Sequence, residues 1–279
     1  MDLSLVALVL LAALLHALWN SFVKVGSDRL ASVAAICATG GLLSLPVALA
    51  TPLPGPASFG FALASVTVHF AYYYCLINAY RFGDLSRAYP LARGLAPPLV
   101  ALGAALAAGE WLRPREVAGI ALVSVGIASL VIGARGQTER RGLWFAAATG
   151  AMIGIYTVID GLGGRSTRVT LSYIAWLNMF EGAVLVAALR VRRGPAGWAA
   201  LRATLPNGAV AGLMATVGYG IVIYAMSHGA MAHVSALRET SVVIAALIGT
   251  LVLGESGAAS RIAAAAVVAG GVVVLTWRG

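Results

Sequence analysis

The sequence predicts an all-α integral membrane protein in which ten transmembrane helices form two inverted five-helix repeats around a central cavity. Three observations predict this fold class: the composition, ten long apolar stretches, and spacings that recur between the two halves. Of the 279 residues, 60% are hydrophobic and 10% are charged, and the mean hydropathy is +0.91. Soluble globular domains carry about 25% charged residues, and disordered chains are poor in apolar residues. The composition therefore excludes both classes.

The ten stretches are long enough to cross a bilayer, whose core of about 30 Å needs roughly 20 apolar residues in a helix. They are expected at residues 3–23, 31–50, 59–80, 88–109, 117–134, 142–159, 170–189, 206–227, 232–253 and 259–277. Five charged side chains fall inside them, namely Arg93, Glu181, Arg238, Glu239 and Arg261. With these boundaries no aspartate lies within a span. Hydrocarbon requires such a partition, because each backbone amide must be satisfied within its helix and each charge is costly.

The first stretch is expected to stay in the protein as a transmembrane helix. Met1 and Asp2 provide no positive segment ahead of it, and its apolar run is long enough to cross the membrane. Most later connections have four to ten residues. The longest expected connection is 190–205, which carries four arginines. No extramembrane domain fits in loops of these lengths.

The distribution of lysine and arginine between the loops predicts the orientation. With ten spans both termini lie on one side, where five basic residues are found, whereas the opposite side carries twelve. Cytoplasmic loops are the richer in lysine and arginine. We therefore expect a multi-pass protein of a bacterial-type inner membrane with both termini outside the cytoplasm. The net charge of +9 then reflects topology, and no nucleic-acid partner is expected.

An internal repeat divides the chain into residues 1–137 and 138–279. The repeated pairs are Arg93 with Arg238 and Gly109-Glu110 with Gly254-Glu255 at a separation of 145, Tyr73 with Tyr219 at 146, and Asn20 with Tyr156 and Lys24 with Asp160 at 136. Because each half has an odd number of helices, the second half enters the membrane from the opposite face. Inverted repeats of this kind are typical of secondary transporters.

Two five-helix halves, each with a helix that runs into Gly-Glu at a membrane edge, resemble the EamA-type proteins of the drug/metabolite transporter superfamily. The residues are Gly109-Glu110 and Gly254-Glu255, and the resemblance covers nearly the whole chain. More narrowly, the sequence resembles bacterial amino-acid exporters, including those for aromatic amino acids. The resemblance implies a basket of ten helices around a central cavity and outward movement of small metabolites. Unlike the four-helix multidrug members, this chain has no acid in its first span.

Polar and aromatic side chains on the first and third helices are candidate substrate contacts. His16 and Asn20 are four residues apart with Trp19 beside them, so they share one face, which lines a wet interior or bonds a neighbouring helix. His69, Tyr73 and Tyr80 also share a face, with Tyr72 and Leu76. Rings with polar tips suit small amphipathic solutes. An interfacial aromatic belt is the alternative for them.

The deep charges allow two interpretations. Arg93 and Arg238 either hold a substrate carboxylate or pair with Glu181, Glu239 or backbone carbonyls and set the packing of the halves. Glu239 adjoins Arg238 but lies about 100° around a regular helix from it, so neighbouring positions are not an obvious ion pair. One turn beyond the first arginine, Pro97 and Pro98 are expected to kink the fourth helix and form a hinge.

Three further aromatic residues complete the candidate site: Trp176, which faces the cavity or lipid, and Tyr156 and Tyr219, which the repeat aligns with Asn20 and Tyr73. The leading function is a secondary exporter of small amphipathic metabolites, chiefly neutral or aromatic amino acids, by alternating access. A lipid flippase on the same fold and an intramembrane enzyme are the alternatives. No phosphate-binding loop or metal-ligand motif is found, so we expect no catalytic residue, cofactor, metal or obligatory protein partner.

Overall fold

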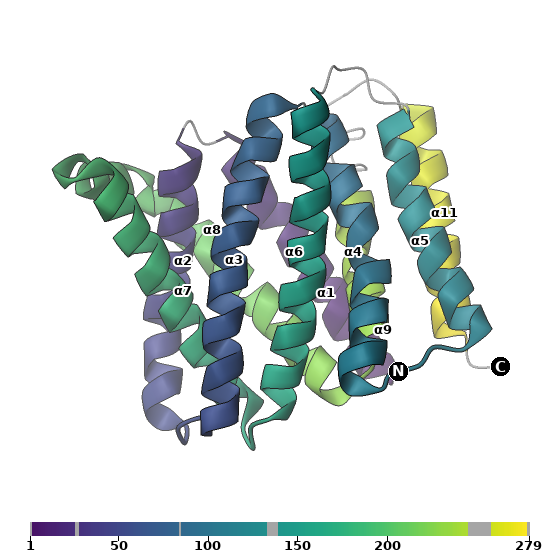
Figure 1. Cartoon of the computed structure of the whole chain (residues 1–279), viewed down its shortest axis with the longest axis horizontal. Coiled ribbons are helices and arrows are strands. Elements are labelled where there is room, and N and C mark those ends of the chain that lie inside the picture. The colour runs from purple at the N-terminus through teal and green to yellow at the C-terminus, as the bar shows by residue number, and fades with distance from the viewer. Residues whose placement is uncertain (1, 26–27, 84, 133–138, 245–257, 278–279) are drawn as a thin grey trace. The chain divides into compact units, whose positions relative to one another are not determined.

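The computed structural model describes residues 2–25, 28–83, 85–132, 139–244 and 258–277, and its regular elements are helices (Figure 1). They are α1 (Leu3–Val25), α2 (Arg29–Ala50), α3 (Pro56–Phe82), α4 (Leu85–Ala108), α5 (Pro114–Ile132), α6 (Arg140–Arg165), α7 (Thr170–Arg193), α8 (Pro195–His228), α9 (Met231–Arg238) and α11 (Ala258–Thr276). The all-helical prediction is therefore confirmed for the described residues.

Seven of the described helices, α2 to α8, are long and apolar enough to cross a membrane. Two others are apolar over shorter ranges, Leu3–Trp19 in α1 and Ser260–Thr276 in α11. Of the ninth expected span, 232–253, residues 245–253 lie outside the described residues. The membrane class is thus supported, whereas a full set of ten spans stays a prediction.

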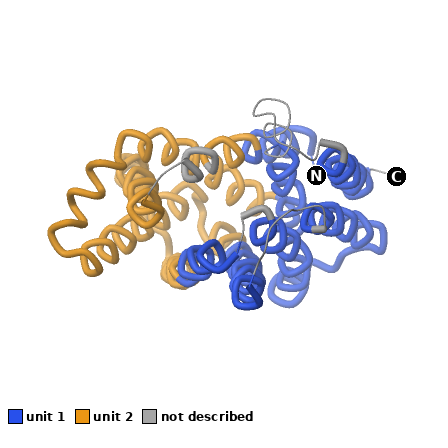
Figure 2. Tube along the Cα trace, turned by 90° about the horizontal axis from the view of Figure 1, so that it is seen from above, with its two compact units in different colours: residues 1–13, 71–158, 229–279 blue, residues 14–70, 159–228 orange. Residues whose placement is uncertain are grey.

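The chain divides into two compact units, coloured blue and orange in Figure 2. Unit 1 comprises residues 1–13, 71–158 and 229–279, and unit 2 comprises residues 14–70 and 159–228. Unit 1 contains all of α4, α5, α9 and α11, and unit 2 contains all of α2, α7 and α8. Each unit therefore combines helices from both halves of the sequence.

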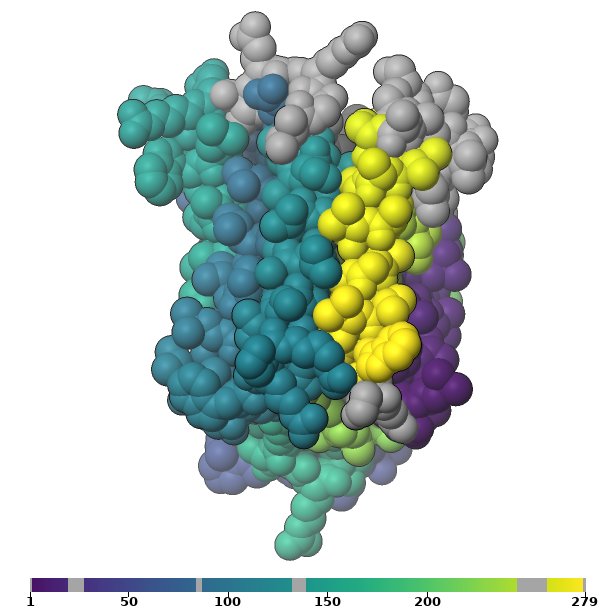
Figure 3. All heavy atoms as spheres, turned by 90° about the vertical axis from the view of Figure 1, so that its right-hand side faces the viewer, coloured from purple at the N-terminus to yellow at the C-terminus, as the bar shows by residue number. Residues whose placement is uncertain are grey.

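Within unit 1, α5 packs along α11, and the two are seen side by side in teal and yellow in Figure 3. A Cβ on Gly126 would lie 2.8 Å from Val268 Cγ2, and a Cβ on Gly271 would lie 2.8 Å from Val123 N. Gly126 and Gly271 are 145 residues apart, as are Val123 and Val268. Each contact is thus matched by its repeat equivalent, which is the pattern that a two-fold axis produces.

Within unit 2, α2 and α7 show the same reciprocity. A Cβ on Gly41 would lie 3.2 Å from Asn178 O, and a Cβ on Gly182 would lie 2.6 Å from Cys37 O. The separation is 141 residues between Gly41 and Gly182, and it is the same between Cys37 and Asn178. In each helix pair the contact positions advance along one helix as they recede along the other. Equivalent helices therefore pack antiparallel, as expected where the second copy of a repeat is inverted.

The connection expected at 190–205 is wrong, because α7 continues to Arg193 and α8 begins at Pro195. Only Gly194 separates them, with φ of 57°. Glycine adopts this left-handed conformation without strain and ends helices for that reason. Proline is favoured at the first position of a helix, where its missing N–H is not needed. Gly194 thus ends α7, and Pro195 directly after it starts α8.

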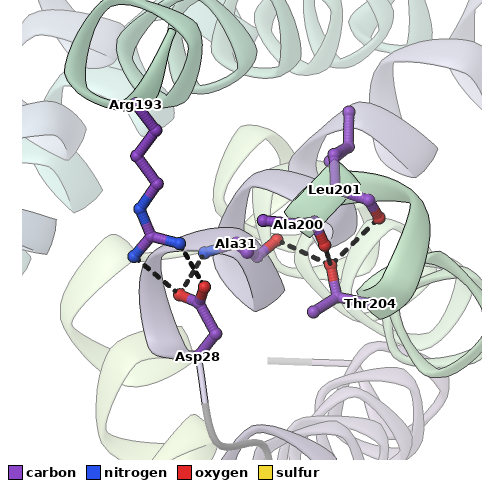
Figure 4. Close-up of polar contacts among 6 residues, drawn as sticks. All are labelled: Asp28, Ala31, Arg193, Ala200, Leu201 and Thr204. Carbon is purple, nitrogen blue, oxygen red and sulfur yellow. Dashed lines mark hydrogen bonds and ion pairs between the residues drawn. The ribbon is translucent and has the colours of Figure 1, made fainter. Parts of the chain in front are cut away.

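An ion pair joins the start of α2 to the end of α7 in unit 2 (Figure 4). Asp28 Oδ1 accepts a hydrogen bond from Ala31 N at 3.1 Å and caps α2. The same carboxylate binds the Arg193 guanidinium, whose Nη2 lies 3.1 Å from Oδ1. Nearby, Thr204 of α8 donates to the Ala31 carbonyl oxygen at 3.2 Å. The start of α2 is therefore joined to α7 by an ion pair and to α8 by a hydrogen bond.

The bond to Arg193 holds the pKa of Asp28 below its ordinary value of 3.8. A carboxyl whose pKa is lower in the folded state stabilises the fold above its unfolded pKa and loses that contribution as pH falls through the folded pKa. Asp28→Asn should keep the cap and lose the pair, at less than about 1 kcal/mol because the pair is partly exposed. Thermal unfolding in detergent from pH 7 down to about pH 3 should then show a smaller loss of stability for the variant than for wild type. Asp28→Ala, which also removes the cap, is the control and should cost more.

Candidate functional site

Two groups of buried polar side chains lie within the apolar helices, one in each unit. The first, the arginine cluster, consists of Arg93, Arg238, Glu239 and Ser241 in unit 1. The second, the aspartate cluster, consists of Ser65, His69, Asp160, Tyr173 and Tyr219 in unit 2. Polar and charged groups inside a membrane are costly and mark sites of function by default.

In the arginine cluster one carboxylate lies between two guanidinium groups. Glu239 Oε2 is 2.8 Å from Arg93 Nε, and Glu239 Oε1 is 3.9 Å from Arg238 Nε. Arg93 Nη2 also donates to Ser241 Oγ at 3.5 Å. The two arginines are 4% and 2% exposed and Glu239 is fully buried. Both arginines therefore pair with an acid, as the packing interpretation expects, and Arg93 in addition has tyrosines beside its guanidinium.

A break in the helix places Glu239 between the arginines. The expected span 232–253 is not continuous, because α9 ends at Arg238 and helical residues resume at Thr240. At the break Glu239 N donates to Ala236 O at 3.2 Å, an i to i−3 bond. The 100° relation between neighbours on a regular helix therefore does not hold here, and Glu239 reaches both cations. Interrupted helices are typical of the binding sites of secondary transporters.

Tyrosines surround the arginine cluster within unit 1. The Tyr72 ring lies 4.9 Å from that of Tyr73 and 5.6 Å from that of Tyr156. Tyr72, Tyr89 and Tyr156 are close enough to the Arg93 guanidinium to interact with it electrostatically. Tyr89 was missed in the sequence, although it precedes the arginine by one helical turn and therefore shares its face.

Tyr80 belongs to the same region of unit 1. It is within electrostatic range of Tyr72 and packs on a small apolar cluster of Ala79, Ala88 and Ala146. Three candidate substrate contacts, Tyr73, Tyr80 and Tyr156, thus gather around Tyr72.

The aspartate cluster is centred on a fully buried carboxylate of α6. Tyr173 of α7 donates to Asp160 Oδ1 at 2.8 Å, and Tyr219 of α8 donates to Asp160 Oδ2. Ser65 of α3 also bonds this carboxylate, and His69 interacts with it electrostatically. Four helices therefore converge on one acid, and two of the predicted residues, His69 and Tyr219, are among its partners.

Ser65 links His69 to the acid. His69 Nδ1 lies 3.0 Å from the Ser65 carbonyl oxygen and 3.1 Å from Ser65 Oγ. A carbonyl can only accept, so Nδ1 carries the hydrogen. The hydroxyl of Ser65 is then free to donate to Asp160. The His69 ring also meets the Tyr219 ring edge-on at 5.8 Å.

Sequence reasoning missed Asp160 because the sixth span was drawn to residue 159. The structure continues α6 to Arg165, so the statement that no aspartate lies within a span is wrong. One signal could have identified it, the repeat alignment that pairs Asp160 with Lys24. A fully buried acid at the end of a predicted span cannot be told from a loop acid by hydropathy alone.

Other predicted residues lie in local aromatic and polar contacts of unit 2. The Trp176 ring is 5.3 Å from Phe59 and 5.7 Å from Phe180, and the rings of His16 and Trp19 are 5.2 Å apart. The side chain of Asn20 lies outside the described residues.

Two predicted structural features lie on α7 and α4. Glu181 is buried on α7. Pro97 and Pro98 lie within α4, which remains one helix from Leu85 to Ala108. The hinge at these prolines stays a prediction. Close packing holds α4 in place, because a Cβ on Gly150 of α6 would lie 2.7 Å from Ala92 O.

The described residues contain no group of three or more histidine, cysteine, aspartate or glutamate side chains that could hold a metal ion.

The sequence profile of the EamA-like transporter family matches residues 3–132 and again residues 140–277. A solved structure known only as the crystal structure of a protein is 22% identical and has a TM-score of 0.72. That match covers 99% of this chain and 97% of the other. At this identity the likeness concerns the fold. No curated protein matches the sequence.

Proposed function

This chain belongs to the EamA-like transporter family, and from that premise we propose that it exports small amphipathic metabolites, namely aromatic or other neutral amino acids. The observation that carries the proposal is the group of tyrosines around Tyr72 beside the Arg93–Glu239 pair, within otherwise apolar helices. A tyrosine offers a ring for apolar contact and a hydroxyl for a hydrogen bond. An amino acid with an apolar side chain presents both kinds of surface.

The proposed substrate contacts are those of the sequence-based site: His16, Trp19, Asn20, His69, Tyr73, Tyr80, Arg93, Tyr156, Trp176 and Tyr219. Pro97, Pro98, Glu181, Arg238 and Glu239 are assigned to structure or gating. The interruption of the helix at Glu239 supports this assignment, because a helix that is already broken can change direction there without losing further backbone hydrogen bonds.

Alternating access is the proposed mechanism. The reciprocal contacts of α5 with α11 and of α2 with α7 support it, because inverted halves give inward-open and outward-open states of similar energy. The energy would come from the gradient of the solute or of an ion.

Flux of amino acids into proteoliposomes tests the proposal. Wild type should transport an aromatic or neutral amino acid, and Tyr73→Ala should lower the flux roughly tenfold, which corresponds to about 1.4 kcal/mol for a lost hydrogen bond and ring contact. Tyr74→Ala is the matched control, because Tyr74 is the next residue on α3 and is 58% exposed. No amino-acid flux under any gradient would overturn the proposal, and lipid scrambling in its place would indicate a flippase.

Contacts between chain segments support the proposed alternation of loops across the membrane. In unit 2, Asp28 and Arg193 pair, and Ser172 Oγ donates to Pro52 O at 2.6 Å. In unit 1, Glu110 accepts from Met231 N at 2.8 Å. Each contact joins two segments that lie in, or directly beside, loops that the ten-span topology assigns to one side.

The orientation itself follows from the basic residues. The side that carries Arg193 has the excess of arginine and is therefore proposed to face the cytoplasm of a bacterial-type inner membrane. Alkaline phosphatase fused to the C-terminus should then be active. An inactive fusion, with an active cytoplasmic reporter at the same position, would reverse the orientation.

A further inference from the structure

Two buried acids of the described helices, Glu239 and Asp160, have opposite surroundings. Glu239 faces two guanidinium groups, so its negative charge is compensated permanently. Asp160 faces Ser65 and His69 of α3, Tyr173 of α7 and Tyr219 of α8. Among these described partners, hydroxyl groups predominate, the imidazole is the only basic group, and there is no lysine or arginine. Among these described partners no lysine or arginine balances the charge of Asp160, so a proton bound to the carboxylate would neutralise it.

We propose that Asp160, joined through Ser65 to His69, is a proton-binding site that couples export to proton entry. The coupling rests on the proposed function, whereas proton binding at Asp160 does not. Within the described part of the chain, no lysine or arginine is among the partners of Asp160, so the aspartate cluster can exist in two states of different charge, as an exchangeable proton requires.

The hydrogen bonds around Asp160 fit both states. In the ionised state Tyr173 and Tyr219 donate to the two carboxylate oxygens. When a proton binds Oδ2, a new O–H bond forms there and points at the Tyr219 oxygen, which then accepts while its own hydrogen turns away. No bond between heavy atoms is made or broken, and the proton is the only species transferred.

Access to the site runs through Tyr219. Ser65, Asp160 and Tyr173 are fully buried and His69 is buried, whereas Tyr219 is partly exposed. Because Tyr219 is the most exposed residue of the aspartate cluster and its hydroxyl is bonded to the acid, a proton is proposed to reach Asp160 along this side chain. The Tyr173 ring packs directly against Gly163, since it lies 2.4 Å from where a Cβ on Gly163 would be.

Infrared difference spectroscopy of the protein in liposomes tests proton binding without a substrate. Between about pH 9 and pH 5 the wild type should gain the C=O stretch of a protonated carboxylic acid, and Asp160→Asn should lack this band. Glu181→Gln is the matched control, since it removes another buried acid of unit 2, and it should keep the band. A band that persists in Asp160→Asn, or no band in wild type, would overturn the proposal.

A second variant leaves Asp160 in place, so that the test does not depend on the folding of Asp160→Asn. Tyr219→Phe removes one donor to the charged form, so its band should appear at a higher pH than in wild type, by about one pH unit. An unchanged pH for the band would contradict the role of Tyr219.

Coupling has its own readout. Asp160→Asn should lose accumulation of an amino acid driven by a pH gradient while keeping exchange between equal concentrations of labelled and unlabelled amino acid. Retained accumulation would overturn the coupling. If wild type moves no amino acid, the proposed function fails, and the infrared result still decides whether Asp160 binds a proton.

Discussion

Glu239→Gln is expected to lower the free energy of unfolding by about 3–5 kcal/mol, because it leaves two buried guanidinium groups without their shared acid. The charge of the arginine cluster would rise by one unit among buried side chains, where a charge is poorly solvated. Unfolding of the purified protein in mixed micelles, followed by tryptophan fluorescence, would measure the loss. The effect is large because the acid is fully buried.

Arg93→Met provides the contrast. It removes one of two cations, so the remaining Arg238 and Glu239 balance in charge, and methionine fills much of the space of the lost side chain. We therefore expect Arg93→Met to cost less than Glu239→Gln, although Arg93 forms the shorter pair. An equal or greater cost for Arg93→Met would mean that the contact at 2.8 Å, and not the charge of the cluster, decides stability.

Gly182→Ala is expected to cost about 1–3 kcal/mol, the usual range for an overpacked interior. The added Cβ would lie 2.6 Å from Cys37 O and 3.2 Å from the carbonyl carbon of the same residue. Both atoms belong to the backbone of α2, so relief requires α2 and α7 to move apart along their length. The same unfolding measurement would detect the change.

Gly60→Ala is its control. Gly60 also lies within a helix, but a Cβ there meets nothing within 4 Å. Its replacement should be neutral or stabilise by up to about 1 kcal/mol, because alanine favours the helix. Similar losses at the two positions would show that the close approach of α2 and α7 does not limit stability.

Hydropathy predicts the described helices well because the hydrophobicity of a segment depends only on its own residues. Each of the seven long apolar helices overlaps an expected span. The ends are less certain, since a helix continues past the apolar run wherever packing satisfies its polar groups. Residues 195–205 are helical because Gly194 and Pro195 change direction in one step, and Asp160 is buried because α6 extends past residue 159.

The sequence by itself determined that the chain belongs in a membrane, where its helices lie, and that its halves repeat, because hydrophobicity and spacing are local properties. Only the tertiary structure decided which polar groups meet. Glu239 pairs with Arg93, which is far away in the sequence. Asp160 accepts a hydrogen bond from the hydroxyl of Tyr219, 59 residues later. Partners from different helices are chosen by how the helices pack, and a pattern along one helix does not contain that information.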